Sequence, residues 1–159
     1  MLVFRTGTGI TVADKRWKIH KFGGSSLADA ACFRRVAGIL LERPDPQLGV
    51  VVSAMAGMTD ALLNLAVLAE RDDDSYNAEL DAIGERYAST ARDLLEGDAL
   101  VSILDAWSKD ATDVRDVLKA NALVKSAPQR SRDVVSGYGE IWSARLLAAL
   151  VQQENEQRG

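Results

Sequence analysis

The chain has 159 residues, of which 47% are hydrophobic and 26% are charged, and its formal net charge is −4. This length and composition predict one globular domain and exclude a disordered or fibrous chain, and the negative charge argues against a nucleic-acid-binding protein, which usually presents a basic surface. No apolar run approaches the about 20 residues that span a bilayer, no signal peptide is recognisable and Cys32 is the only cysteine, so we expect a cytoplasmic protein without membrane contact or internal disulfides.

The first predicted strand covers residues 17–22, where aromatic and β-branched side chains nearly alternate with charged ones. Gly23 and Gly24 end it, and Ser25 or Ser26 is expected to cap the helix that follows. The apolar residues of that helix recur with helical spacing and should face the core: Phe33, Val36, Ala37 and Leu40.

The rest of the chain alternates once more between strand and helix and then becomes helical. Residues 49–53 predict a strand covered on both faces, and residues 59–70 predict a helix. Residues 77–120 carry two apolar stripes with helical spacing, which predict an antiparallel helical hairpin. A last helix is expected over residues 129–153. The apolar stripes of the hairpin consist of Leu80, Ile83, Tyr87, Ala91 and Leu94, and of Leu100, Ile103, Trp107, Ala111, Val114 and Leu118.

This order of elements predicts an α/β fold with parallel strands. Residues 1–16 are expected to form a lead-in segment. Two strands make only a marginal sheet, so the chain has the pattern of the first part of a larger one. Because unpaired strand edges invite pairing with other chains, we expect self-association into a homo-oligomer.

Lys21, Gly23, Gly24 and Ser25 form the first candidate site, at the end of the first strand. Glycines let the backbone approach a ligand closely, and the backbone amides that open a helix attract anions. Lys21 adds a full positive charge. Phosphoryl transfer depends on this kind of positioning and charge stabilisation, although an ordinary glycine turn with a solvated lysine fits equally well.

Two further candidates are weaker when taken alone. Ser53 and Thr59 flank a turn of small residues after the second strand, and both hydroxyls could hold a carboxylate or phosphate. Glu140 follows Gly137 and Gly139, which weaken a helix and suggest that another backbone or a ligand approaches there. Each has a plainer interpretation, as a helix cap and as a surface glutamate.

Together these segments resemble the aspartate kinases. Residues 20–29 (HKFGGSSLAD) are similar to the family's opening motif, residues 51–59 (VVSAMAGMT) to its second, and residues 139–146 (GEIWSARL) to a third. The three occur in the family's order, and their forms are closest to the kinase part of bifunctional aspartokinase/homoserine dehydrogenases. The resemblance implies the α/β/α sandwich of the amino-acid kinases, with residues 17–159 as the N-terminal portion of that domain.

The reaction that the resemblance implies is transfer of the γ-phosphoryl group from MgATP to the side-chain carboxylate of L-aspartate. The product is 4-phospho-L-aspartate, and the step opens the biosynthesis of the aspartate-derived amino acids. Mg²⁺ would enter with ATP, and no metal site on the protein is implied. Lys21 would neutralise the transferring phosphoryl group, and the phosphates would lie against Gly23, Gly24 and Ser25.

The aspartate would be held by Ser53 and Thr59, and Glu140 would bind its ammonium group. Since the family's later strands and regulatory domains do not follow in this sequence, we expect that these 159 residues alone do not turn over.

Two other functions remain open. One is a different amino-acid kinase, acting on glutamate, N-acetylglutamate, carbamate or a nucleotide, and the other is a non-catalytic interaction module built on the hairpin of residues 77–120.

Overall fold

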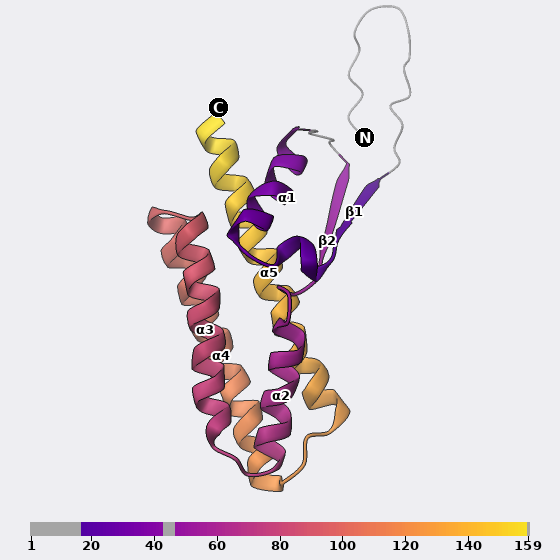
Figure 1. The fold of residues 1–159 in the computed structure, drawn as a ribbon, viewed down its shortest axis with the longest axis vertical. Coiled ribbons are helices and arrows are strands. Elements are labelled where there is room, and N and C mark those ends of the chain that lie inside the picture. The colour runs from indigo at the N-terminus through magenta and orange to yellow at the C-terminus, as the bar shows by residue number, and fades with distance from the viewer. Residues whose placement is uncertain (1–16, 43–46, 159) are drawn as a thin grey trace, which may run out of the picture.

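The structure, a computed structural model, describes residues 17–42 and 47–158 (Figure 1). The lead-in predicted for residues 1–16 lies outside the described residues. The predicted α/β architecture is confirmed, with helices making up most of the described chain. In chain order, the elements are β1 (Lys18–Phe22), the 3₁₀ helix η1 (Gly24–Leu27), α1 (Ala30–Glu42), β2 (Leu48–Val52), α2 (Met58–Glu70), α3 (Ser75–Leu94), α4 (Gly97–Val124) and α5 (Gln129–Arg158).

Strands β1 and β2 pair in parallel, as predicted, and they end side by side. The register runs from Lys18 opposite Leu48 to Phe22 opposite Val52. The backbone N–H of Ser53 continues the pairing by donating to the Phe22 carbonyl at 3.0 Å. The segments that follow the two strands therefore begin next to each other, which is where ligands bind in open α/β sheets.

Only one face of the sheet is covered by described elements. Val50 and Val52 line a hollow of about 490 Å³ together with side chains of α1 and α5. On the opposite face, Ile19 is 62% exposed and Val51 is 51% exposed. The expectation that the second strand is covered on both faces is therefore wrong, because among residues 17–42 and 47–158 no element packs over the Val51 face.

The predicted helical hairpin is confirmed. Helices α3 and α4 run side by side and pack against α2 and α5 (Figure 1). Every residue of the stripe predicted on α3 is buried, and the stripe on α4 is buried or half-buried. Leu80 and Leu118 have no exposed surface at all. Removal of this apolar surface from water is the main force that holds the hairpin together.

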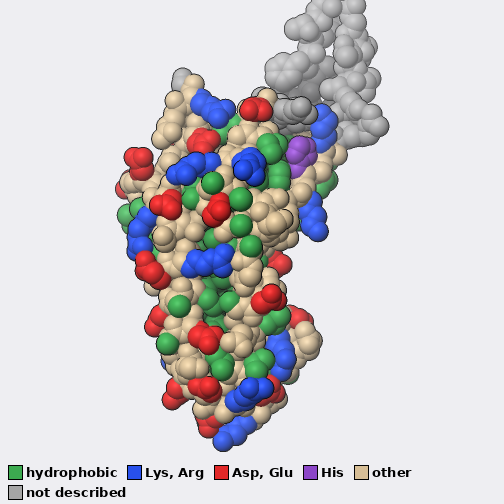
Figure 2. Space-filling model, viewed as in Figure 1, with side chains coloured by type: hydrophobic (Ala, Val, Ile, Leu, Met, Phe, Trp, Pro, Cys, Tyr) green, Lys and Arg blue, Asp and Glu red, His purple; other side chains and the backbone are tan. Residues whose placement is uncertain are grey.

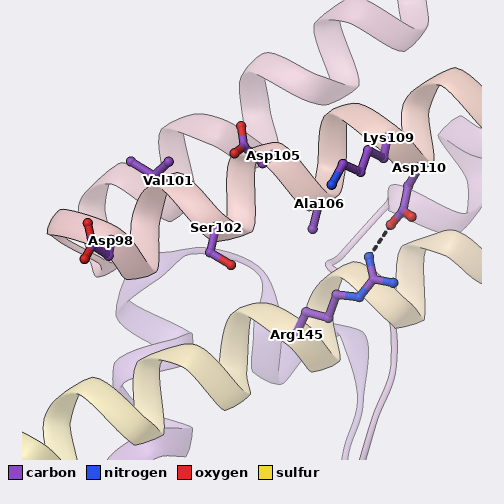
Figure 3. A pocket seen from close by; sticks show the side chains of 8 residues that line it. All are labelled: Asp98, Val101, Ser102, Asp105, Ala106, Lys109, Asp110 and Arg145. Atoms are coloured by element: carbon purple, nitrogen blue, oxygen red, sulfur yellow. Dashed lines mark hydrogen bonds and ion pairs between the residues drawn. The ribbon is translucent and has the colours of Figure 1, made fainter.

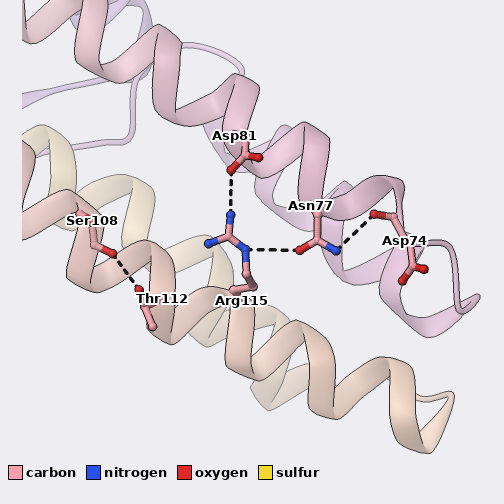
Figure 4. A network of polar contacts seen from close by, with 6 residues as sticks. All are labelled: Asp74, Asn77, Asp81, Ser108, Thr112 and Arg115. Atoms are coloured by element: carbon pink, nitrogen blue, oxygen red, sulfur yellow. Dashed lines mark hydrogen bonds and ion pairs between the residues drawn. The ribbon is translucent and has the colours of Figure 1, made fainter.

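Polar contacts on the outside of the hairpin add little by comparison. Arg115 of α4 donates to Asp81 at 2.7 Å and to Asn77 at 3.3 Å, both on α3 (Figure 4). The Asp81 side chain is 70% exposed. Because solvent screens such pairs, each contributes at most about 1 kcal/mol. The network therefore sets the register of the two helices more than it stabilises them.

An aromatic cluster fixes α5 against the hairpin. The buried Trp142 ring contacts Tyr87, Trp107 and Tyr138, with ring centroids 5.9–6.0 Å apart. Its indole N–H donates to the carboxylate of Asp110 on α4 at 3.0 Å. Burial raises the pKa of the Tyr87 hydroxyl, which stays protonated and donates to the Trp142 carbonyl at 3.3 Å. Helix α5 is therefore held in a single orientation at its fourth turn.

The surface of the molecule carries charges of both signs. On the face shown in Figure 2, Lys and Arg side chains are interspersed with Asp and Glu over the whole described length. Within the described part of the chain, no helix has the length and apolar character needed to cross a membrane.

Candidate functional site

The two glycines of the first motif have different surroundings. A methyl group built on Gly24 would lie 3.0 Å from the Ala54 carbonyl oxygen, so this glycine lets the first turn pack against the second. The same construction on Gly23 meets nothing within 4 Å. Gly23 therefore presents backbone to open space, where a ligand can approach, whereas Gly24 has a packing role.

The expectation that Ser25 or Ser26 caps the first α-helix is wrong. Ser25 and Ser26 lie inside η1, whose cap position is held by Gly23. Helix α1 begins later, and the carboxylate of Asp29 accepts the backbone N–H of Cys32 at 2.9 Å. This hydrogen bond holds the pKa of Asp29 below its ordinary value. The hydroxyls of the two serines are therefore not committed to capping α1.

The second motif forms a tight turn with a buried centre. Ala54 and Met55 are buried, and Gly57 has a φ of +75°, a conformation that glycine adopts most readily. Helix α2 starts at Met58, so Thr59 lies in its first turn with an exposed side chain. Ser53 is half-buried and directly follows β2. The two hydroxyls thus flank the turn, as the sequence predicted.

The third motif approaches the same turn from α5. A methyl group built on Gly139 would lie 2.9 Å from the Ala54 Cβ, 3.2 Å from the Met58 Cγ and 3.3 Å from the Leu62 Cδ1. The sequence predicted that another backbone or a ligand approaches the glycines before Glu140. A close approach does occur at Gly139, but it is made by side chains of the second motif and α2. Gly137 has open space instead.

The turn at Ala54 is where the three motifs meet. Its carbonyl faces Gly24 of the first motif, and its methyl group faces Gly139 of the third. Residues more than 80 positions apart in the sequence are thus brought within van der Waals distance of one short turn. This close packing of the three motifs is the principal geometric feature of the candidate site.

The charged side chains of the motifs do not contact one another. Lys21 lies on the open face of the sheet with Ile19 and Val51, and Glu140 projects from α5, which lies against β2. Both side chains are exposed, and among the described residues neither has a hydrogen-bond or ion-pair partner. The structure therefore packs the three motifs against one turn, while the Lys21 and Glu140 side chains are exposed and do not contact each other.

A polar groove on the helical side of the molecule is separate from these motifs. A groove of about 560 Å³ lies between α4 and α5, and its walls carry Asp98, Asp105 and Lys109 (Figure 3). At one end, Arg145 of α5 reaches across to the carboxylate of Asp110. In residues 17–42 and 47–158, no cluster of His, Cys, Asp or Glu has the grouping needed to hold a metal ion.

Comparison with known proteins decides the family. The sequence profile of the amino acid kinase family matches residues 16–157, nearly the whole chain. The chain belongs to the amino acid kinase family. The family assignment implied by the three motifs is thereby confirmed.

The amino acid kinases to which this chain is similar in sequence include bifunctional enzymes. The chain is 37% identical over 137 residues to bifunctional aspartokinase/homoserine dehydrogenase 2, chloroplastic, of Arabidopsis thaliana, which covers 86% of this chain and 15% of the relative. It is 35% identical over 139 residues to bifunctional aspartokinase/homoserine dehydrogenase 2 of Escherichia coli (strain K12), covering 86% of the chain and 16% of the relative. The chain thus spans about one sixth of these relatives' length.

The fold also matches an amino acid kinase of known structure. The crystal structure of E. coli aspartokinase III in complex with aspartate and ADP superposes with a TM-score of 0.73 and 25% sequence identity. The match covers 88% of this chain and 30% of that one. The arrangement of strands, turns and helices described above is therefore that of the aspartokinase fold.

Two residues near the motifs were missed by the sequence analysis. Arg86 on α3 donates to carbonyls of both glycine turns, but an arginine on an exposed helix face carries no local signal of such a role. Asp110 is 91% buried and anchors Trp142 and Arg145. Its signal was available, because an acid three residues after Trp107 falls within the apolar stripe of α4.

Proposed function

We propose that this chain carries the phosphate-binding and aspartate-binding turns of an aspartate kinase, which transfers the γ-phosphoryl group of MgATP to the side-chain carboxylate of L-aspartate. The observation that carries the proposal is the meeting of three motifs at the Ala54 turn. The names of the relatives support aspartate as the acceptor, since each of those compared above is called an aspartokinase.

The chemistry requires little beyond positioning. A carboxylate oxygen of aspartate attacks the γ-phosphorus, the bond from that phosphorus to the β,γ-bridging oxygen breaks, and ADP leaves with the electron pair. No proton is transferred and no covalent enzyme intermediate forms. Catalysis then consists of holding two anions in line and offsetting the negative charge that develops between them.

The phosphates would be bound at the end of β1. Gly23 exposes its backbone to open space, and Lys21 carries an exposed ammonium group without a partner among the described residues. Ser25 adds an exposed hydroxyl in η1, and Gly24 keeps this turn against the second one. Mg²⁺ would arrive as part of the nucleotide substrate, bound by its phosphate oxygens.

The aspartate would be bound between the second and third motifs. Ser53 and Thr59 flank the turn and can donate to a carboxylate, and Glu140 follows the glycine that packs on that turn. Glu140 is exposed and has no partner within residues 17–42 and 47–158, and such a carboxylate suits the single cationic group of an α-amino acid. N-acetylated acceptors, carbamate and nucleotides offer no such group, so Glu140 favours an amino acid with a free ammonium.

The alternative of an interaction module has less support. Its working surface would be the apolar stripes of residues 77–120, and those stripes are buried against α2 and α5. Apolar side chains that fill the core are not available to a partner. The hairpin is therefore better explained as part of the domain that holds the site.

The proposal is tested by ADP release from the natural polypeptide that contains residues 17–158. We expect turnover with L-aspartate and none with N-acetyl-L-aspartate, which lacks the ammonium group. Replacing Glu140 by Gln should raise the KM for aspartate about tenfold or more, as expected for loss of a charged hydrogen bond. Glu156→Gln, an exposed change on the same helix, is the control and should leave the KM unchanged. Equal rates with both acceptors would contradict the assignment.

The proposal also includes the oligomeric state of the protein and its location in the cell. The open face of the sheet, with the exposed Ile19 and Val51, favours a homo-oligomer. The composition favours the cytoplasm, whereas the Arabidopsis relative is named as chloroplastic. Light scattering of the purified protein and fractionation of the source cells would decide these two points.

A further inference from the structure

Arg86 connects the helical hairpin to both glycine turns. It belongs to α3, and its Nη2 donates to the Ala56 carbonyl at 2.8 Å and to the Ala28 carbonyl at 3.4 Å. Ala56 lies in the turn of the second motif, and Ala28 directly follows η1 of the first. One guanidinium nitrogen thus holds two segments that are 28 residues apart in the sequence.

The two carbonyls that accept from Arg86 belong to irregular backbone. Neither residue is part of a strand, and each lies just before the helix of its own motif begins. A hydrogen bond from a guanidinium to a carbonyl is stronger than one between neutral groups. The contribution of Arg86 should therefore be local, acting on these turns more than on the core.

The contact between the turns would be loose without this arginine. Gly24 lies against the Ala54 carbonyl and the backbone of Ala56, and the Ser53 N–H donates to the Phe22 carbonyl. In the first motif these contacts are made at Phe22 and Gly24, close to the end of β1 and several residues before Ala28. Contacts at one place leave the outer parts of the turns able to pivot. Arg86 adds a second point of attachment further from the strands, which fixes the angle between the turns.

We infer that Arg86 is a positioning residue, which sets the geometry of the first turn relative to the second and so couples the hairpin to the site. The inference rests on the proposed function for what the turns bind. The bridging contact itself does not depend on it. Transition-state alignment is sensitive to displacements of about 1 Å, so a change in the angle between the turns should reduce kcat.

The first test is hydrogen exchange on the natural polypeptide, comparing wild type with Arg86→Gln. Peptides over residues 22–29 and 53–58 should exchange about tenfold faster together, in line with loss of one charged hydrogen bond, while peptides over residues 100–118 stay unchanged. Arg86→Lys should recover part of the protection, because an ammonium group can still bond one carbonyl. Unchanged exchange in the two turns would overturn the inference, and so would faster exchange everywhere, since the latter indicates global destabilisation.

Arg92→Gln is the matched control. It lies on the same helix, and its guanidinium pairs with Glu85 at 2.9 Å where both side chains are largely exposed. We expect the exchange of both turns to match wild type in this variant.

The second test is kinetic. Arg86→Gln should lower kcat about tenfold with the KM for aspartate within about twofold, and Arg86→Lys should restore part of kcat. A wild-type kcat in Arg86→Gln would overturn the inference while leaving the kinase assignment intact. Conversely, a wild-type protein without kinase activity would refute the proposed function, and the exchange result would still decide whether Arg86 ties the turns together.

Discussion

The two ends of this molecule are built on different principles. At the helical end, α3 and α4 bury regular apolar stripes against α2 and α5, and the side chains themselves hold the elements in place. At the strand end, Lys21 and Glu140 are exposed, and neither has a hydrogen-bond or ion-pair partner among the residues that the structure describes. There the order comes from close packing at Gly24 and Gly139 and from the hydrogen bonds of Arg86.

This difference separates residues that stabilise the fold from residues that serve the site. A substitution of a buried side chain at the helical end should change the free energy of unfolding. A substitution of an exposed side chain at the strand end should change binding or rate and leave stability nearly intact. Residues at the junction, such as Gly139, should affect both.

The largest expected effect is on the rate of the strand-end variant Lys21→Ala. Loss of a positive charge at the transferring phosphoryl group should lower kcat/KM about a thousandfold, equivalent to about 4 kcal/mol. Because Lys21 is exposed, the midpoint of thermal unfolding should hardly change. Lys119→Ala, an exposed change on α4, should leave both quantities at wild-type values. A fully active Lys21→Ala would remove Lys21 from the site.

The largest expected effect on stability belongs to the helical end. Leu118→Ala should lower the free energy of unfolding by about 3 kcal/mol, because Leu118 is completely buried and its truncation leaves a cavity. Leu123→Ala on the same helix should change it by less than about 0.5 kcal/mol, since that side chain is 85% exposed. Chemical denaturation measures both. Equal losses of unfolding free energy in Leu118→Ala and Leu123→Ala would show that the apolar stripe of α4 is not part of the core.

Gly139→Ala is expected to affect both ends. Its methyl group would overlap the Ala54 Cβ, and we expect a loss of about 1 kcal/mol in stability together with a raised KM for aspartate. Gly137→Ala lies two residues earlier in open space, where the helix propensity of alanine should stabilise the protein by up to about 1 kcal/mol. A lower midpoint of thermal unfolding in Gly139→Ala and a higher one in Gly137→Ala would confirm the close approach at Gly139. Stabilisation by both changes would refute it.

The smallest expected effect is a dependence on pH at Asp29. The Cys32 N–H lowers the pKa of this carboxyl group in the folded state, so its contribution to stability is present above the usual carboxyl range and is lost as the pH falls through the lowered pKa. Asp29→Asn keeps a capping oxygen but cannot titrate. Acid unfolding of the wild type should therefore be slightly steeper than that of the variant. Identical acid profiles would show that the Asp29 cap does not contribute.

The helical end could be predicted almost completely from sequence. Spacing alone assigned the buried stripe of α3, including Tyr87, and the glycines before Glu140 correctly signalled a close approach. The strand end was predicted in its motifs but not in its detail. Because two serines follow the glycines, the sequence favoured them as the cap of α1, whereas the cap is Asp29. The apolar pattern of β2 did not indicate that its Val51 face is exposed.

The reason for this contrast is physical. Periodicity records which side of a regular element faces the core, and it reports nothing about contacts made by irregular backbone. The meeting of Gly24 with Ala54 and the bridge from Arg86 both involve carbonyls, which are present in every residue and leave no trace in the sequence. Such contacts become visible only when the chain is folded.

The central claim, that three motifs around the Ala54 turn form one site, is tested most directly by hydrogen exchange with and without MgADP and L-aspartate. The account predicts that peptides over residues 21–26, 53–59 and 138–142 gain protection together when both ligands are added, while peptides over residues 98–110, which line the polar groove, do not change. Protection confined to one motif, or to the groove between α4 and α5, would contradict the claim.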